Sequence, residues 1–264
     1  MMDPIRLWTT KQTQPMKRIV IIGASSGIGR RVASDFARLG MRVGIAARRE
    51  EPLKRLAEQY PDRMVYSTID VTSAEATQQL EQLIERLGGM DIMLVASGMG
   101  KMNPTLDTDV DLDTVHVNVG GFVRMVNTAY RYFRNRTDQS VSGQIAVITS
   151  VAGTKGIGIA ASYSASKRFG STYIDALDQL AHLQKVNVDF TDIRPGFIRT
   201  DFLAGTKPFP LEMALDYAAP RIELAILRRR RVAVIDSRWR CVVALWNCIP
   251  QCVWSRMPIN VTNS

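Results

Sequence analysis

Short, continuous apolar runs alternate with longer amphipathic stretches along most of this chain, and this alternation constrains the fold more than any other feature. It is typical of βαβ units around a parallel sheet, because strands that are apolar on both faces need helices on both sides. The expected strands are residues 18–22, 42–46, 64–69, 92–96, 144–149, 187–193 and 232–235. The expected helices are residues 28–39, 52–59, 73–87, 109–133, 162–183 and 218–227. We therefore predict an α/β fold with a doubly wound parallel sheet in three α/β/α layers.

Nothing in the 264 residues divides the chain into separate units. There is no internal repeat or low-complexity linker, so we expect a single domain over residues 16–264, with a basic and apolar C-terminal extension at 228–264. Residues 1–15 are polar and lack the apolar core of a signal peptide, which predicts a flexible leader. No apolar run reaches the roughly 18 residues that a membrane-spanning helix needs.

Cysteine, histidine and charge content exclude several classes of protein. The three cysteines, Cys241, Cys248 and Cys252, are an odd number without a pairing framework, which indicates a reducing compartment and a cytoplasmic protein. The two histidines are far from them in sequence, so we expect no metal site. The net charge of +9 includes a local arginine run at 228–231. Because the excess is local and no basic and aromatic residues interleave, we do not expect nucleic-acid binding.

A glycine-rich turn follows the first expected strand directly and opens a helix. Backbone N–H groups at a helix N-terminus bind a pyrophosphate, and glycines let the backbone approach it closely. A tight turn without a ligand is the alternative, but the strand before the turn and the helix after it favour binding. The predicted cofactor contacts in this turn are Gly23, Ser25, Ser26, Gly27, Ile28 and Gly29.

Tyr163 and Lys167 are four residues apart on an expected helix and therefore lie on one face of it. A neighbouring ammonium lowers the pKa of a tyrosine, which makes the phenol a useful acid or base near neutral pH. A solvated helix face is the alternative for this pair alone. Ser150, which follows a strand and precedes Tyr163 by thirteen positions, favours a catalytic group.

The turn and the Ser-x13-Tyr-x3-Lys spacing together resemble the short-chain dehydrogenase/reductase family, and the resemblance extends over most of the chain. It implies a Rossmann fold and an oxidoreductase, class EC 1.1.1.-, that passes hydride between NAD(P) and a carbonyl or alcohol. By this resemblance, Ser150 holds the substrate carbonyl and Tyr163 donates or accepts the proton. Lys167 lowers the pKa of the tyrosine and holds the nicotinamide ribose, and Asn118 supports a water relay to the lysine.

The same resemblance implies further cofactor contacts. Asp70 and Val71 match the residues that contact the adenine ring, although Asp70 could instead be a helix N-cap. Pro195 and Gly196 follow a strand and Thr200 matches a contact of the carboxamide, with a plain turn as the alternative. The family's Asn-Asn-Ala-Gly is replaced by residues 95–98, Val-Ala-Ser-Gly, of which only Gly98 is retained.

The end of the second expected strand predicts a preference for NADP, with NAD as a possible second cofactor. An acidic residue there binds the ribose 2′-hydroxyl of NAD, whereas an arginine accepts a 2′-phosphate. Ala47 stands where NAD-preferring relatives carry an aspartate, and Arg48 follows it. A solvated arginine pair is a stronger alternative for Arg49 than for Arg48.

A nucleotide-binding sensor or scaffold on the same fold is the second hypothesis. The four intact residues Asn118, Ser150, Tyr163 and Lys167 favour a catalyst that acts on a small-molecule carbonyl or alcohol. The resemblance also implies a homodimer or homotetramer, paired through the helices around Asn118 and Tyr163. The apolar stripe on one of these helices could equally face its own sheet; its members are Phe169, Tyr173, Ile174 and Leu177.

The tail has two open interpretations. Residues 239–249 are apolar with arginines and tryptophans at the edges, which suits a helix in an anionic membrane interface on the cytoplasmic side. A helix that folds over the substrate pocket or a partner has the same pattern. A membrane contact would favour a lipid-like substrate. Apolar residues near the expected pocket also suggest an apolar substrate; they are Phe202, Leu203, Phe209, Leu211 and Met213.

Overall fold

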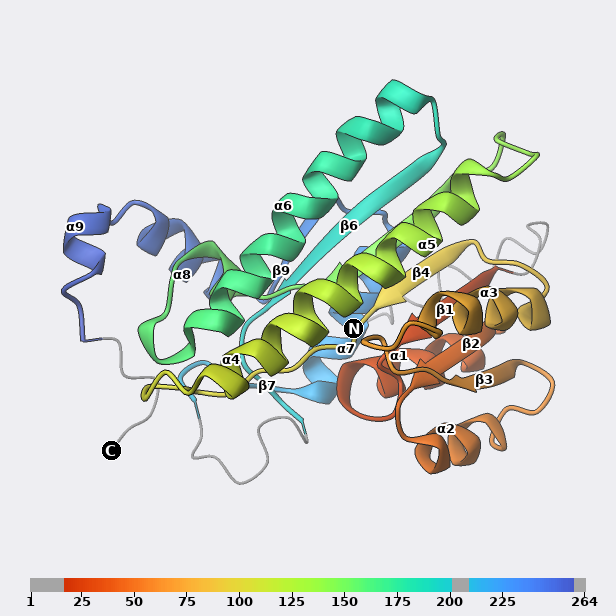
Figure 1. Cartoon of the computed structure of the whole chain (residues 1–264), viewed down its shortest axis with the longest axis horizontal. Helices are drawn as coiled ribbons and strands as arrows, with labels where there is room; N and C mark the ends of the chain where they lie inside the picture. Colours follow the sequence, from red (N-terminus) through yellow and green to blue (C-terminus); the bar gives the residue numbers. More distant parts are fainter. Residues whose placement is uncertain (1–16, 201–208, 259–264) are drawn as a thin grey trace.

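The computed structural model describes residues 17–200 and 209–258, so the expected leader at 1–15 and the pocket candidates Phe202 and Leu203 lie outside the described residues. Seven parallel strands form one sheet in the order β3-β2-β1-β4-β5-β6-β9 (Figure 1). The strands are β1 (Arg18–Ile22), β2 (Arg42–Ala47), β3 (Met64–Thr68), β4 (Ile92–Val95), β5 (Gly143–Ile148), β6 (Val188–Pro195) and β9 (Val232–Ile235). All seven predicted strands and the doubly wound α/β fold are confirmed.

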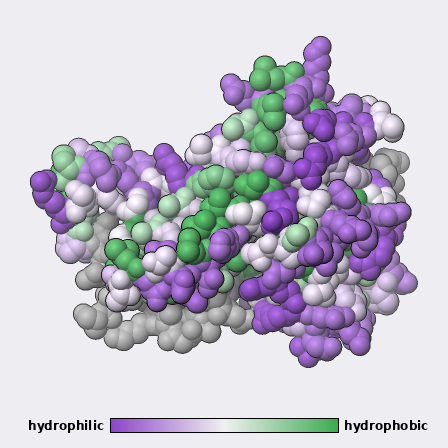
Figure 2. Space-filling model, in the orientation of Figure 1, coloured by the Kyte–Doolittle hydropathy of each residue, from purple (hydrophilic) through white to green (hydrophobic). Residues whose placement is uncertain are grey.

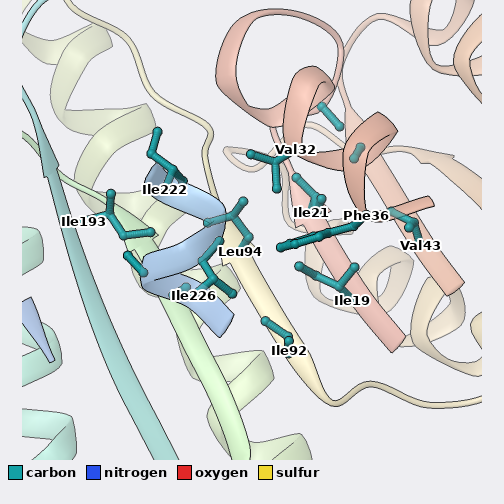
Figure 3. Packing of buried hydrophobic residues seen from close by; sticks show 14 of the residues in the cluster. Ile19, Ile21, Val32, Phe36, Val43, Ile92, Leu94, Ile193, Ile222 and Ile226 are labelled. Atoms are coloured by element: carbon teal, nitrogen blue, oxygen red, sulfur yellow. The ribbon is translucent and has the colours of Figure 1, made fainter. Parts of the chain in front are cut away.

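Helices cover both faces of the sheet because successive strand residues point to opposite sides. Ile19 and Ile21 of β1 pack with one layer of helices, and Val20 and Ile22 pack with the other. Figure 3 shows the first of these clusters, where Phe36 lies among side chains of β1, β2 and β4. The helices of this layer are α1 (Gly27–Arg38), α2 (Glu50–Ala57), α7 (Leu215–Leu227) and α8 (Ser237–Asn247). The opposite layer contains α3 (Ala76–Leu87), α5 (Phe122–Arg134) and α6 (Ala161–Gln184).

The helix expected over residues 109–133 is one continuous element with a change of winding inside it. It consists of α4 (Thr108–Val115), a π-helical turn η2 (His116–Gly121) and α5. The predicted helix is confirmed, but the π turn inside it was not predicted, because a π turn inserts a residue without changing the apolar pattern on either side. Such turns are frequent at functional sites, and this one carries Asn118.

The arginine run is partly internal to the fold. Arg229 forms an ion pair with Asp189 of β6, and Arg231 forms ion pairs with Asp175 and Asp178 of α6. Two of the four charges therefore fasten the α7–β9 connection to its neighbours, whereas Arg228 is exposed.

The C-terminal residues fold back onto the domain. We define the arm as residues 236–258, which contains α8 and α9 (Gln251–Trp254), separated at Pro250 as the sequence predicts. Trp239 and Trp254 are buried, and the arm lies beside the start of α6 in Figure 1. In residues 17–200 and 209–258, no helix combines the length and apolar character needed to cross a membrane.

Candidate functional site

A cavity of about 860 Å³ opens where the carboxyl ends of β1, β4, β5 and β6 meet. Ligands bind at this edge in open α/β sheets. Every predicted cofactor contact lines it, and so do Ser150, Tyr163 and Lys167. Among the predicted catalytic and cofactor residues, Asn118 alone does not line the cavity; of the described pocket candidates, Leu211 lines it and Phe209 and Met213 do not. The predicted residues gathered around this one space extend from Gly23 to Thr200, 177 positions apart in the sequence.

The glycine-rich turn is shaped by close backbone packing. Gly23 has a φ of +92°, and a Cβ atom there would lie 2.5 Å from the backbone nitrogen of Ser97. A Cβ atom on Gly29 would lie 2.4 Å from the carbonyl oxygen of Gly23. Since real side chains do not approach backbone so closely, only glycine fits at either position. The turn thus keeps its backbone at the cavity, beside the N-terminus of α1.

Two arginines lie beside this turn. Arg48 and Arg49 both line the cavity next to Ala47, and Arg49 Nη2 donates a hydrogen bond to Ser25 Oγ at 3.1 Å. We expected Arg48 to be the phosphate partner and gave more weight to a solvated role for Arg49. The hydrogen bond to Ser25 places the Arg49 guanidinium at the glycine-rich turn as well.

Asp70 closes a short turn after β3. It accepts hydrogen bonds from Thr72 N at 3.0 Å and from Thr72 Oγ1 at 2.7 Å. These bonds, the backbone one foremost, lower the pKa of Asp70. Helix α3 begins at Ala76, so Asp70 is not its N-cap.

Ser150 and Tyr163 meet at the inner end of the cavity. Ser150 Oγ accepts a hydrogen bond from Ala152 N at 3.1 Å and lies 3.4 Å from the carbonyl oxygen of Pro195. The Tyr163 hydroxyl is hydrogen-bonded to Ser150. Burial raises the pKa of Tyr163, and the bond to Ser150 offsets only part of this effect. We expected the neighbouring lysine to lower this pKa; burial dominates instead.

Lys167 lies one helical turn further along α6. Its ammonium donates a hydrogen bond to the carbonyl oxygen of Ile148 at 2.9 Å and lies 5.7 Å from the centroid of the Tyr163 ring. Burial lowers the pKa of Lys167 to about 8, and the carboxylate of Asp192 acts in the opposite direction. The lysine therefore keeps its charge at neutral pH by a small margin.

Asn118 is buried, and both the oxygen and the nitrogen of its side-chain amide form hydrogen bonds. Its Oδ1 accepts a hydrogen bond from Met99 N at 2.7 Å. Its Nδ2 donates to the carbonyl oxygen of Met99 at 2.6 Å and to Ser166 Oγ at 3.0 Å. The π turn thus ties the segment after β4 to the helix that carries Tyr163 and Lys167. Gly98 leaves room for the lysine, since a Cβ there would lie 3.3 Å from Lys167 Nζ.

The sequence analysis missed Asp192 and the tryptophans of the arm. Asp192 is 1% exposed on β6, accepts a hydrogen bond from Thr149 Oγ1, and forms an ion pair with Arg194 at 2.7 Å. An aspartate within an otherwise apolar strand could have revealed it, because buried charges are rare unless paired. Trp239 and Trp246 line the cavity, but their placement depends on long-range packing.

Comparison with known proteins identifies the family. The short chain dehydrogenase family model matches residues 17–209, which is most of the chain. The chain belongs to the short chain dehydrogenase family. Members of this family are oxidoreductases of alcohols or carbonyls that use NAD or NADP. The resemblance inferred from the glycine turn and the Ser-Tyr-Lys spacing is confirmed.

Two curated relatives show the range of similarity. The chain is 31% identical over 199 residues to a "Dehydrogenase/reductase SDR family protein 7-like" of Dictyostelium discoideum, a match that covers 70% of this chain and 60% of that protein. It is 31% identical over 197 residues to a farnesol dehydrogenase of Aedes aegypti, covering 71% of this chain and 79% of the relative. The chain therefore matches less than two thirds of the length of the Dictyostelium protein.

Two solved structures share the fold. A short chain dehydrogenase from Burkholderia cenocepacia in complex with NADP superposes with a TM-score of 0.78 at 19% identity, covering 93% of this chain and 98% of the other. A 3-ketoacyl-(acyl-carrier-protein) reductase from Brucella melitensis complexed with NADH gives a TM-score of 0.75 at 21% identity, covering 84% and 98%. At these identities the likeness shows the fold alone.

Replacing Asp192 tests the electrostatics of the site. The Asp192→Asn variant removes the carboxylate that raises the pKa of Lys167, so this pKa should fall below about 8 and the lysine should lose its proton at a lower pH. NMR titration of labelled lysine side chains measures it. Asp189→Asn is the control, because Asp189 lies on the same strand but pairs with Arg229. An unchanged Lys167 titration in Asp192→Asn, or an equal shift in both variants, would contradict this account.

Proposed function

We propose that the protein is an NADP-dependent oxidoreductase that transfers hydride between the nicotinamide and a carbonyl or alcohol, with Tyr163 as its acid/base. The observation that carries the proposal is the hydrogen bond between Ser150 and Tyr163 at the inner end of the cavity, with the Lys167 ammonium beside the phenol. The cavity continues from there to the glycine turn, so one space serves both the reacting groups and a dinucleotide.

The residues present fit a nicotinamide dinucleotide. The glycine turn, with no room for a Cβ at Gly23 or Gly29, is suited to hold the pyrophosphate at the start of α1. Asp70 and Val71 would contact the adenine end, and Pro195, Gly196 and Thr200 would lie at the nicotinamide end; all five line the cavity. When bound, the cofactor supplies or accepts the hydride.

The protein's own groups handle the proton. Because burial raises the pKa of Tyr163, the phenol is protonated at neutral pH and donates its proton to a carbonyl oxygen that Ser150 also contacts. Lys167 would hold the nicotinamide ribose, and its ammonium places a positive charge beside the phenol of Tyr163. Asn118 acts through position, since its hydrogen bonds join the segment after β4 to α6.

The Tyr163→Phe variant tests the acid/base role. The ring remains and packing changes little, so the variant should bind cofactor normally and lose turnover by about a hundredfold or more, the usual contribution of a positioned acid or base. Initial rates of NADPH oxidation with a validated ketone measure turnover, and calorimetry measures cofactor binding. Turnover near that of the wild type would refute the role given to Tyr163.

The proposed preference for NADP rests on positive charge beside the glycine-rich turn. Arg48 and Arg49 line the cavity, Ala47 offers no carboxylate to repel a phosphate, and Arg49 already contacts Ser25. A guanidinium pairs strongly with a phosphate. One solved structure of this fold contains NADH and another contains NADP, so the fold alone does not select the cofactor. The positive charges of Arg48 and Arg49 are what support NADP in this chain.

Titration with both cofactors checks this preference. We expect the wild type to bind NADP more tightly than NAD. Arg48→Ala should weaken NADP binding by about tenfold and leave NAD binding nearly unchanged, since only NADP carries the 2′-phosphate. Arg49→Ala is the matched variant and should show a similar selective loss. Tighter binding of NAD than of NADP to the wild type would overturn the preference.

The substrate is apolar and uncharged. The charged side chains among the described lining residues are Arg48, Arg49, Asp70 and Lys167. All four belong to the proposed cofactor site or to the reacting groups. The far end is lined instead by apolar and aromatic side chains, including Phe197, Leu211 and Trp239. The similar farnesol dehydrogenase has a name that fits such a substrate.

A homodimer or homotetramer pairs through α5 and α6. Ile174 and Leu177 face their own sheet, but Phe169 and Tyr173 are only partly buried. Figure 2 shows hydrophobic residues gathered on the face where α6 lies beside α5. Light scattering tests this assembly, and a monomer at micromolar concentration would exclude it.

The outer face of the arm contacts an anionic membrane surface on the cytoplasmic side. Leu245, Val253 and Met257 are 71%, 50% and 41% exposed. The arm carries three exposed arginines and one acidic residue, the buried Asp236, which pairs with Arg238. Exposed apolar side chains among arginines suit an anionic interface. Sedimentation with anionic and neutral vesicles tests this contact, and no binding to anionic vesicles at low salt would refute it.

A single domain over residues 16–264 is part of this proposal. It is supported by the described residues, 17–200 and 209–258, in which the seven strands of the main sheet form one continuous sheet. A non-catalytic sensor or scaffold on this fold would need no Ser150–Tyr163–Lys167 arrangement. Its presence, with each group in contact with the next, favours the enzyme.

A further inference from the structure

The arm forms one wall of the cavity with a row of aromatic rings. Phe209 stacks on Phe197 with ring centroids 4.4 Å apart, and Phe197 meets Trp239 edge-on at 5.7 Å. Trp239 lies 6.2 Å from Trp246, which in turn lies 5.7 Å from Trp254. Within the described part of the chain, Phe197, Trp239 and Trp246 are the members of this row that line the cavity.

Each indole in the row donates a hydrogen bond to a residue outside the arm. Trp239 Nε1 donates to the carbonyl oxygen of Leu211 at 3.2 Å. Trp246 Nε1 donates to Thr154 Oγ1 at 2.8 Å, and Trp254 Nε1 donates to the carbonyl oxygen of Gly156 at 2.8 Å. A buried indole N–H needs such a partner, so these bonds fix the orientation of the rings.

Two of these bonds attach the arm to the loop that follows Ser150. Residues 151–154 form a single 3₁₀ turn, whose N-cap is Ser150 itself. Thr154 and Gly156 accept from the two tryptophans, and Lys155 Nζ donates to the carbonyl oxygen of Ile249 at 2.9 Å. Three consecutive residues of this loop therefore bind the arm. These bonds fix the position of the aromatic wall relative to Ser150.

Trp239 packs closely on backbone. A Cβ atom on Gly196 would lie 2.1 Å from Trp239 Nε1, so the indole rests directly on the glycine of the predicted nicotinamide-side turn. Trp246 projects from α8 beside Val242, and both side chains line the cavity. Truncating Trp246 therefore adds space along the wall that the arm forms and leaves the contact between Trp239 and Gly196 in place.

We propose that Trp246, oriented by Thr154, limits the size of the substrate that fits between the arm and the Ser150–Tyr163 pair. This inference rests on the proposed function and names a specificity-determining residue for it. The ring forms the apolar end of the substrate space, and the ligand it admits is a compact, uncharged ketone or alcohol. A longer or bulkier substrate would have to displace the indole and break its bond to Thr154.

The test compares the full chain as wild type, Trp246→Ala, Trp246→Phe and Asn247→Ala. Asn247 is the exposed neighbour on the same helix, so its truncation controls for changes to α8. Straight-chain methyl ketones of increasing length give kcat/KM with NADPH. Unreactive amide analogues of the same lengths give dissociation constants for the NADPH complex by calorimetry, so the size limit is measured even without turnover.

Trp246→Ala should raise the ratio of kcat/KM for the longest ketone to that for the shortest by about tenfold or more, and the amide affinities should change in parallel. Trp246→Phe should change the ratio of kcat/KM values and the amide affinities in the same direction but by less. Asn247→Ala should match the wild type in both measurements. Wild-type ratios in a folded Trp246→Ala would overturn the inference; if that variant does not fold, wild-type ratios in Trp246→Phe would do so. Amide binding without turnover in the wild type would contradict the proposed function and leave this inference standing.

Discussion

The packing of the β1–α1 turn against the end of β4 is the constraint on which the rest of the site depends. Gly23 and Gly29 let backbone meet backbone at distances that no side chain would allow. The N-terminus of α1 consequently lies at the carboxyl edge of the sheet, next to the segment that replaces the family's Asn-Asn-Ala-Gly. That edge is also where β5 delivers Ser150 and where α6 places Tyr163 and Lys167. The cavity to which we assign the dinucleotide and the reacting carbonyl follows from this single meeting of strand ends.

Burial sets the protonation of the reacting groups. It raises the pKa of Tyr163 and lowers that of Lys167 to about 8, because a buried site disfavours either charge. The lysine has the carboxylate of Asp192 to oppose this effect, whereas the tyrosine has only its hydrogen bond to Ser150. The resulting pair, a neutral phenol beside an ammonium, is the arrangement that a carbonyl reductase needs at neutral pH.

The strands, most of the helices and the candidate cofactor and catalytic residues in the cavity could be predicted because their patterns are local. Continuous apolar runs identify buried parallel strands, and motif spacing places Ser150, Tyr163 and Lys167 on known elements. The π turn at Asn118 could not be predicted, since an inserted residue leaves the apolar pattern intact. The arm was ambiguous for a different reason: a short helix that is apolar on most sides suits a membrane surface or a protein interior equally well. The structure shows that its inner face packs on the cavity through Trp239 and Trp246, while Leu245 stays exposed.

Transfer of deuterium from the cofactor tests the central claim most directly. NADPH that carries deuterium at the reactive carbon of its nicotinamide would be incubated with the protein and a set of apolar ketones, and the products analysed by mass spectrometry. The account predicts an alcohol with one deuterium on its carbinol carbon, because hydride passes directly between cofactor and substrate in the cavity. Tight NADPH binding with no deuterium in any alcohol would contradict it and would favour a nucleotide-binding sensor on the same fold.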